Sequence, residues 1–397
     1  MKKVVILGGG TFEPIRNHLS LSAPAFGNTA IQIHKLIPGS ELVLTKMADR
    51  DSNLKSNSDV EKYIDELLLD PKVGTIVLNV AFCDFKSLPI DGIENGFHSD
   101  RLKTVEGNLT LELTPTDKVI AKIRQKRPDI FLIGFKTTTN KTSDEQFLIA
   151  LQMMKKTKCN LVLANDTVTR NNMVITPEET IYGETTDRQA ALKELVDMIL
   201  LRNDLTYNHS IFNEVESTPI STTPETFQET IKFLLDNVGF IENNGNGFTP
   251  GHFCYKLDDK SFLSSQRKAN HNLVFTEGMS KVEVDNDEFI VSGKRKASVG
   301  ARSQWLILQQ NPEYDCIIHT HNPLKQGSEI PVTEQRPFQC GSLECGINTV
   351  SHMKEFDGIK AVYLDKHGAN ILFKSTDNIE KITNFVLENI ELGTKVK

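Results

Sequence analysis

The stretch KKVVILGGGTFEPIR, residues 2–16, opens with a continuous apolar run that ends in three glycines. An apolar run without polar alternation is typical of a parallel strand that is buried on both faces. The pattern recurs in ELVLTK (41–46), GTIVLNVAF (74–82), DIFLIGF (129–135) and CNLVLAND (159–166). Helical patterns lie between these segments and after the last one, at 60–70, 117–126, 143–158 and 187–202. This alternation predicts an α/β class and a Rossmann-like parallel-sheet domain over residues 1–205.

The second half of the chain has a different pattern of apolar segments and turns. Residues 206–223 are polar and rich in Ser and Thr, which favours a linker. A helix is expected over 224–240, and then short strand-like segments alternate with Gly, Asn and Asp turns. A helical pattern at 298–312 leads into the apolar strand CIIHTH (316–321). Residues 224–397 therefore predict a separate domain that mixes helices with a mainly antiparallel sheet.

Composition limits the classes of partner. The chain has 397 residues, more than the roughly 250–300 at which single hydrophobic cores stop growing, so two domains are expected. A net charge of −7 argues against binding nucleic acid through its phosphates. No segment approaches the ~18 apolar residues of a membrane span, and six scattered cysteines form no disulfide framework. We expect a cytoplasmic protein that acts on small molecules.

The carboxyl ends of the predicted parallel strands carry the first set of candidate site residues, because ligands of open α/β sheets bind at that edge. Glycine lets a phosphate approach backbone N–H groups, while Asp and Asn bind a metal ion, a ribose or a base edge. A tight turn is the alternative explanation for the glycines. The residues are Gly8, Gly9, Gly10, Thr11, Ala81, Asp84, Gly134, Phe135, Ala164, Asn165 and Asp166.

Five motifs of this half, in order over residues 1–202, resemble phosphopantothenoylcysteine synthetase, the ligase half of the bacterial coenzyme A bifunctional protein. GGGTFEPIR resembles the family's GGTxEPI opening, and VAFCDF (80–85) resembles its AAxxD motif. RLKTVEGNLTLELTPTDKVI (101–120) resembles its KIKK-containing stretch. IGFKTTTN (133–140) resembles VGFAAET, and LVLANDT (161–167) resembles the family's VAND segment.

The resemblance implies a ligase that activates a carboxylate with CTP, or with ATP as in eukaryotic members, together with Mg²⁺. The family forms an acyl-nucleotide from phosphopantothenate and releases pyrophosphate, and the amine of cysteine then displaces the nucleotide. By position, Lys103 stabilises phosphate charge, Asp84 lies by the nucleotide or its Mg²⁺, and Phe135 packs near the base. Asn165 and Asp166 lie at the edge of the sheet.

The sequence also departs from this family. Members carry an Asn in an SNxSSG-like segment that handles the acyl-nucleotide. The matching stretch here is HLSLSAPAFGN (18–28), where no Asn falls at that place and Asn17 is displaced. Arg101 replaces the first lysine of the KIKK motif, and Lys136 adds a charge to the GFAAET motif.

Three histidines form the second set of candidates. His319 and His321 are two residues apart in a strand, so both point to the same face. His367 in DKHGANILF (365–373) supplies a third imidazole, and three neutral imidazoles suit an open Zn²⁺ site. A hydrogen-bonded core histidine is the alternative interpretation of each one.

This half resembles the class II aldolase/adducin family, an α/β/α fold, through the HTH strand, GSLECGINTV (341–350) and the later HG. Enzymatic members bind Zn²⁺ through three histidines and act on sugar phosphates. The acidic PSSE-like segment is absent, since KASVGAR (296–302) stands there, and the phosphate-binding TGGNxS motif is reduced to TPGHF (249–253). Glu334 is the expected acid/base, with Glu344 second.

We therefore expect a phosphopantothenate–cysteine ligase-like enzyme fused to a zinc-binding, aldolase-like domain. The alternatives are a Zn²⁺-dependent aldolase, epimerase or dehydratase, or a non-catalytic nucleotide-binding assembly protein. Both resemblances imply a homo-oligomer, either a dimer or a tetramer.

Overall fold

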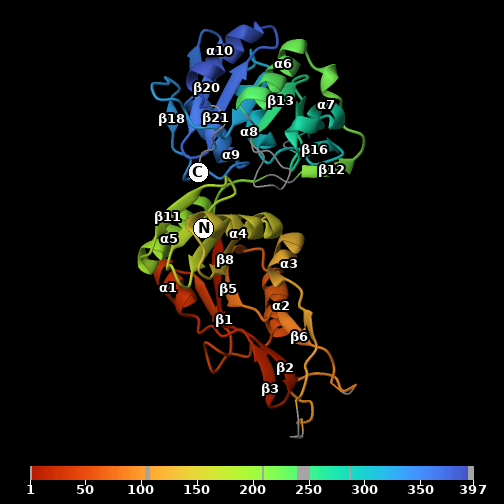
Figure 1. The fold of residues 1–397 in the computed structure, drawn as a ribbon, viewed down its shortest axis with the longest axis vertical. Helices are drawn as coiled ribbons and strands as arrows, with labels where there is room; N and C mark the ends of the chain where they lie inside the picture. The colour runs from red at the N-terminus through yellow and green to blue at the C-terminus, as the bar shows by residue number, and fades with distance from the viewer. Residues whose placement is uncertain are drawn as a thin grey trace. The chain divides into compact units, whose positions relative to one another are not determined.

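The computed structural model describes residues 2–90, 92–102, 108–207, 210–238, 251–285 and 288–391. The chain divides into two compact units (Figure 1). The first comprises Met1–Pro177 and Ile181–Asp204, and the second comprises Glu178–Thr180 and Leu205–Lys397.

The first unit is built on a seven-stranded sheet with strand order β11-β10-β9-β8-β5-β1-β4. Its first five strands along the chain are parallel to one another, and an antiparallel hairpin, β10–β11, extends one edge. The expected Rossmann-like sheet is confirmed, with this hairpin added. The strands are β1 (Lys3–Gly10), β4 (Glu41–Leu44), β5 (Val73–Ala81), β8 (Phe131–Thr138), β9 (Leu161–Asp166), β10 (Asn172–Ile175) and β11 (Ile181–Thr185).

Helices cover both faces of this sheet, which is why its strands are apolar throughout. One face packs against α1 (Asn28–Leu36) and α5 (Arg188–Arg202). The other packs against α2 (Asn57–Leu67), α3 (Val119–Lys126) and α4 (Ser143–Thr157) (Figure 1). Two small hairpins lie beyond the ends of the strands: β2 (Phe12–Arg16) with β3 (Leu19–Ser22), and β6 (Phe85–Ser87) with β7 (Leu113–Pro115).

The second unit contains a ten-stranded, mainly antiparallel sheet with order β12-β16-β15-β14-β13-β17-β21-β20-β18, and β19 pairs with β20. Only the β12–β16 and β18–β20 pairs are parallel among the described strands. The strands are β12 (Ser210–Glu214), β13 (His252–Lys256), β14 (Ser261–Ser264), β15 (Ser280–Asp285), β16 (Glu288–Gly293), β17 (Cys316–Thr320), β18 (Val332–Thr333), β19 (Lys354–Phe356), β20 (Ile359–Leu364) and β21 (Gly368–Phe373).

Helices also lie on both faces here, so the expected α/β/α arrangement is confirmed. The helical segments on one face are η1 (Ile220–Thr222), α6 (Glu225–Phe233), η2 (Leu234–Val238), η3 (His271–Leu273), α7 (Val274–Glu277) and α10 (Ile379–Asn389). The opposite face packs against α8 (Ala301–Gln310), with α9 (Leu343–Ser351) beside it.

The structure corrects the interpretation of residues 206–223 as a linker. Strand β12 within this segment pairs with β16, and Ile220 lies in the hydrophobic core of the second unit. The reason is that β12 is an edge strand with mostly exposed side chains. An edge strand needs few apolar residues, so its composition resembles that of a linker.

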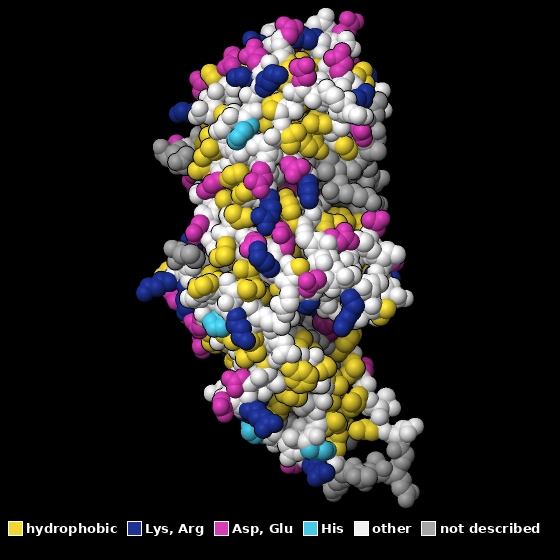
Figure 2. Space-filling view, turned by 90° about the vertical axis from the view of Figure 1, so that its left-hand side faces the viewer, with side chains coloured by type: hydrophobic (Ala, Val, Ile, Leu, Met, Phe, Trp, Pro, Cys, Tyr) yellow, Lys and Arg dark blue, Asp and Glu magenta, His cyan; other side chains and the backbone are white. Residues whose placement is uncertain are grey.

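Charged side chains are mixed on the surface. In the view of Figure 2, lysine and arginine are scattered among acidic residues rather than gathered in one basic area. Among the described residues, no helix is both long and apolar enough to cross a membrane.

Candidate functional sites

The three glycines after the first apolar run do not form an open loop. Strand β1 continues through Gly10 and pairs with β5 along that whole length. A Cβ on Gly8 would collide with Ala30 of α1, and one on Gly9 would collide with the Thr45 hydroxyl. Gly9 also has φ of +108°, which favours glycine. These glycines therefore permit close packing within the protein.

Thr11 and Ala81 come together where β1 and β5 end. The backbone N–H of Thr11 donates to the Ala81 carbonyl at 3.0 Å, and its hydroxyl lies 3.2 Å from the same oxygen. That hydroxyl is also 2.6 Å from the Asn57 side-chain oxygen and accepts from the N–H of Cys83 at 3.0 Å. The Thr11 side chain is fully buried, so this network holds the two strand ends together.

A polar surface forms at the carboxyl edge of the sheet, on the face covered by α1 and α5. Strands β5, β8 and β9 bury alternate residues under these helices. Continuing the alternation places Asn79, Phe135 and Asn165 on this face. The Asn165 side-chain oxygen accepts from the Thr137 hydroxyl at 3.3 Å. Asn79 was not predicted, although an Asn within the apolar run VLNVAF is a visible signal.

Arg188 lies at the same edge and was also missed by the sequence analysis. Its guanidinium donates to the Asn172 side-chain oxygen at 2.9 Å and to the Thr29 hydroxyl at 3.1 Å. Burial lowers the pKa of this guanidinium. No ion pair of Arg188 with a carboxylate is found among the described residues. Since Thr29 is in the first turn of α1, Arg188 places a positive charge beside a helix N-terminus.

The N-terminus of α1 contributes further positive potential. Its N-cap is Gly27, which makes no side-chain cap, and its first turn has no acidic residue. The first N–H groups of a helix and its dipole favour anions. Together with the asparagines, this edge can hold a phosphate or a carboxylate. We call Asn79, Phe135, Asn165 and Arg188 the α1-side edge; Asn172 is buried beneath it and holds the Arg188 guanidinium in place.

The remaining predicted residues of the sheet edge lie on the opposite face or in loops. A Cβ on Gly134 would lie 3.0 Å from the Cys159 sulfur, so Gly134 admits α4 and its flanking loop close to the sheet. Asp84 is exposed and forms an ion pair with Lys118. These residues do not join the α1-side edge.

Asp166 has a local structural role. Its buried carboxylate accepts hydrogen bonds from the Thr138 hydroxyl and from the backbone N–H groups of residues 140, 141, 168 and 169, at 2.8–3.1 Å. Burial raises the pKa of Asp166, but the hydrogen bonds outweigh burial and lower the pKa below its usual range. Asp166 thus ties the loop before α4 to the turn after β9.

Asn17, a predicted catalytic residue of the first unit, does not lie at this edge. Asn17 is exposed in the turn between β2 and β3, where its backbone N–H donates to the Ser99 carbonyl at 3.2 Å. Its side-chain oxygen lies 3.2 Å from Nδ1 of His18. Lys103 lies outside the described residues.

The three predicted histidines converge in the second unit. His319 is in β17, His321 follows that strand, and His367 lies in the turn between β20 and β21. One ligand nitrogen from each lies within 4.8 Å of the others. Their ring centroids are 4.6–4.9 Å apart and their planes are inclined by 57–78°. This grouping suits one metal ion with an open position.

Gly368 explains why His367 reaches the other two. A Cβ on this glycine would collide with the Thr320 carbonyl oxygen, and its φ is +149°. Strand β21 pairs with β17 from this point, with Thr320 opposite Ala369. The glycine after His367 therefore allows the close approach that brings the third imidazole to the site.

His319 has the properties of a ligand. Both ring nitrogens are buried and have no hydrogen-bond partner among the described residues. Unpaired buried polar atoms are costly unless something binds them. Burial lowers the pKa of His319 well below its usual range, and neighbouring imidazoles lower it further. The ring is therefore neutral, which is the form that binds a metal.

The two candidate acids are not part of this group. The Glu334 side chain is exposed, and its backbone carbonyl accepts from the Asn348 side chain at 3.0 Å. The Glu344 carboxylate accepts from the backbone N–H of Thr206 at 3.0–3.1 Å, at the start of α9. Glu344 thus has a structural role, and the metal-ligating group found among the described residues contains histidines alone.

Comparisons with known proteins found a curated relative and several similar solved structures. The coenzyme A biosynthesis bifunctional protein CoaBC of Thermococcus kodakarensis is 27% identical over 175 residues, which are 41% of each protein. The chain thus spans about two fifths of the length of this curated relative. The DNA/pantothenate metabolism flavoprotein from Streptococcus pneumoniae is a similar solved structure, with 21% identity, a TM-score of 0.41, and coverage of 50% of this chain and 97% of that one.

Solved structures similar to this chain also include an L-fuculose 1-phosphate aldolase, with 18% identity and a TM-score of 0.30. It covers 42% of this chain and 82% of its own. The model of the DNA/pantothenate metabolism flavoprotein C-terminal domain matches residues 1–199. The chain therefore belongs to the family of the DNA/pantothenate metabolism flavoprotein C-terminal domain.

Proposed function

We propose that the first unit is a ligase of the phosphopantothenate–cysteine type, which activates a carboxylate with CTP or ATP and Mg²⁺. The family match and the similarity to a coenzyme A biosynthesis protein support the type of reaction. The observation that carries the proposal is the α1-side edge, where amide side chains and a cation lie beside the N-terminus of α1.

The α1-side edge offers what the reaction needs. In the first step a carboxylate oxygen attacks the α-phosphorus of the nucleotide and pyrophosphate leaves. Fixed positive charge stabilises such a transfer, and Arg188 with the N-terminus of α1 supplies it. In the second step the amine nitrogen of cysteine attacks the acyl carbon, and the nucleoside monophosphate leaves. Phe135 offers a flat surface for the base.

The amides of this edge also compensate for a departure from the family. Since Asn17 lies in the β2–β3 turn, another amide has to hold the acyl-nucleotide. Asn79 and Asn165 lie on the face that carries Phe135, so we assign this role to them. The glycines and Asp166 then act through packing. The assignment of Asp84 to Mg²⁺ rests on the family resemblance alone, because its carboxylate pairs with Lys118 outside the α1-side edge.

The test is pyrophosphate release by the full chain. Phosphopantothenate with CTP or ATP and Mg²⁺ should release pyrophosphate, and cysteine should convert this into repeated turnover. Each nucleotide is tried with and without the acid, because release without the acid indicates only hydrolysis. Absence of release with either nucleotide and phosphopantothenate contradicts the proposal.

A second function is favoured by one observation in the second unit, namely the unpaired nitrogens of His319 beside His321 and His367. We propose that these histidines hold a Zn²⁺ ion and that this half acts as a lyase on a phosphorylated sugar or related carbonyl compound. A zinc ion held there would polarise a carbonyl oxygen. Metal analysis of the purified chain should find about one zinc per chain, since three imidazoles hold one ion. A zinc-free protein that takes up no added zinc contradicts this proposal.

A further inference from the structure

A fourth histidine lies against the three. His252 begins strand β13 and pairs directly with His319 of β17. Its side chain is only 7% exposed. The two rings are stacked, with centroids 4.6 Å apart and planes inclined by 25°. On the other side of His319 the direct neighbour across the sheet is Asn370 of β21.

The stacked geometry is not that of a ligand. A metal ion lies close to the plane of each imidazole that binds it. The nearly parallel planes of His252 and His319 meet only far from the two rings, so one ion cannot lie in both. The planes of His321 and His367, in contrast, are steeply inclined to that of His319. His252 therefore belongs to the wall of the site and not to the ligating group.

Gly300 shows that the protein makes room for this ring. It is the N-cap of α8, with φ of −73° and ψ of −1°, a conformation open to any residue. A Cβ at this position would lie 2.7 Å from Cε1 of His252. The glycine is therefore explained by space alone, and the ring is held between α8 and His319.

We propose that His252 is a positioning residue of the histidine centre, which keeps the ring of His319 in the orientation that binds the metal. The inference rests on the proposed zinc site. Residues behind a metal ligand set its orientation, and their loss weakens metal binding by roughly 10–100-fold. A stacked ring can do this without a hydrogen bond, because it blocks rotation of His319 toward α8.

The first test compares His252→Ala with His252→Phe. Zinc affinity is measured by competition with a chromophoric chelator, using the full chain. The Ala variant should bind zinc roughly 10–100-fold more weakly, while the Phe variant, which keeps a flat ring, should stay close to wild type. Cobalt-substituted His252→Ala should also show a shifted visible absorption band, because the orientation of a ligand ring has changed.

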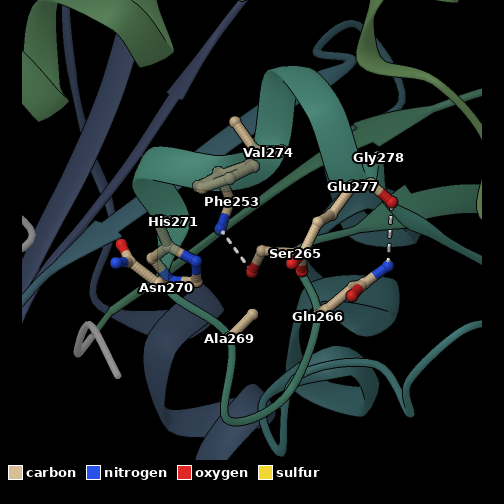
Figure 3. Close-up of a pocket in the computed structure, with 9 residues that line it drawn as sticks. All are labelled: Phe253, Ser265, Gln266, Ala269, Asn270, His271, Val274, Glu277 and Gly278. Carbon is tan, nitrogen blue, oxygen red and sulfur yellow. Dashed lines mark hydrogen bonds between the residues drawn. The ribbon is translucent and has the colours of Figure 1, made fainter. Parts of the chain in front are cut away.

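His271 provides the matched control. It is also buried, but it lies beside Phe253 (Figure 3). Phe253 packs into the core on one face of the sheet, whereas His252 and Cys254 alternate with it and face the other. Its Nε2 lies 3.3 Å from the Gly251 carbonyl oxygen. His271→Ala should therefore disturb packing while leaving zinc affinity near that of wild type. Thermal unfolding of the metal-free proteins separates loss of the fold from loss of affinity.

A double substitution sharpens the test. Gly300→Ala in the wild-type background should push on the His252 ring and weaken zinc binding. In the His252→Ala background the added methyl group has room, so it should cause no further loss. Additive losses would overturn the proposal.

The possible failures are distinguishable. A wild-type chain that binds neither zinc nor cobalt overturns the metal site and the role of His252 together. If wild type binds and the His252→Ala variant binds equally well, only the role of His252 is overturned. A Phe variant as weak as the Ala variant assigns the effect to a ring nitrogen, which also overturns the stacking role.

Discussion

The two candidate sites both lie where strands end, but their motifs behave differently on folding. In the first unit, contiguous motifs such as GF and ND place one residue on each face of the sheet, so Phe135 and Asn165 separate from Gly134 and Asp166. In the second unit, HTH keeps its two histidines on one face because they are two residues apart. Spacing along the strand, more than motif identity, therefore decides which side chains share a site.

The largest expected effect tests the histidine site. His319→Ala removes one of three ligands and should reduce bound zinc from about one ion per chain to none, because two imidazoles do not complete a zinc site. Metal analysis after gel filtration measures this. Retention of zinc by a folded variant would contradict the assignment of His319 as a zinc ligand.

Arg188 tests the other site. Arg188→Ala removes a fixed cation at the α1-side edge and should slow pyrophosphate release roughly 10–100-fold, the range for losing a charged hydrogen bond of about 1.5–3 kcal/mol. Lys193→Ala is the matched control, because this lysine lies on the same helix and its side chain is 73% exposed. Equal rates for both variants would remove Arg188 from the site.

Gly9 tests whether the glycine run is needed for packing. Gly9→Ala places a Cβ against the Thr45 hydroxyl and should lower the free energy of unfolding by about 1–3 kcal/mol beyond the backbone strain. Gly39→Ala measures the strain alone, since Gly39 also has a positive φ but nothing within 4 Å of a Cβ. Thermal unfolding compares the two. Equal losses would argue against tight packing at Gly9.

The smallest effect concerns acid. Hydrogen bonds hold the pKa of Asp166 below its ordinary value in the folded chain. Its contribution to stability is therefore complete above the unfolded-state pKa of about 3.9 and is lost as pH falls toward the folded-state pKa. The stability difference between wild type and Asp166→Asn should shrink below about pH 4. A difference that stays constant from neutral pH to pH 3 would contradict this role.

Much of the fold could be predicted from periodicity. The five parallel strands, both domain classes and the final helix of the first unit follow from apolar runs and helical spacing. The segment 206–223 could not be predicted, because β12 is an exposed edge strand whose composition matches a linker. The β10–β11 hairpin was not predicted either, because its strands are short and join the sheet only through the pairing of β10 with β9.

The candidate sites divide in the same way. The three histidines could be predicted because the spacing HxH places two side chains on the same face of a strand, and the HG dipeptide marks a third histidine just before a later strand. Arg188 could not be predicted, because an arginine at the start of a helix is common and marks no site by itself. It reaches the site only because α5 packs beside α1. His252 could not, because its partner lies 67 positions later and only the register of β13 with β17 places the two side by side.

The sequence by itself determined the two-domain α/β architecture, the three-histidine group and the family of the first half. These depend on local patterns: apolar runs, two-residue alternation and ordered motifs. Only the tertiary structure decided which face each polar residue occupies. It also showed that Ala30 and Thr45 occupy the space beside Gly8 and Gly9, and that His252 stacks on His319. The physical reason is that helix packing and strand register bring together residues far apart in sequence, and no local sequence pattern predicts those contacts.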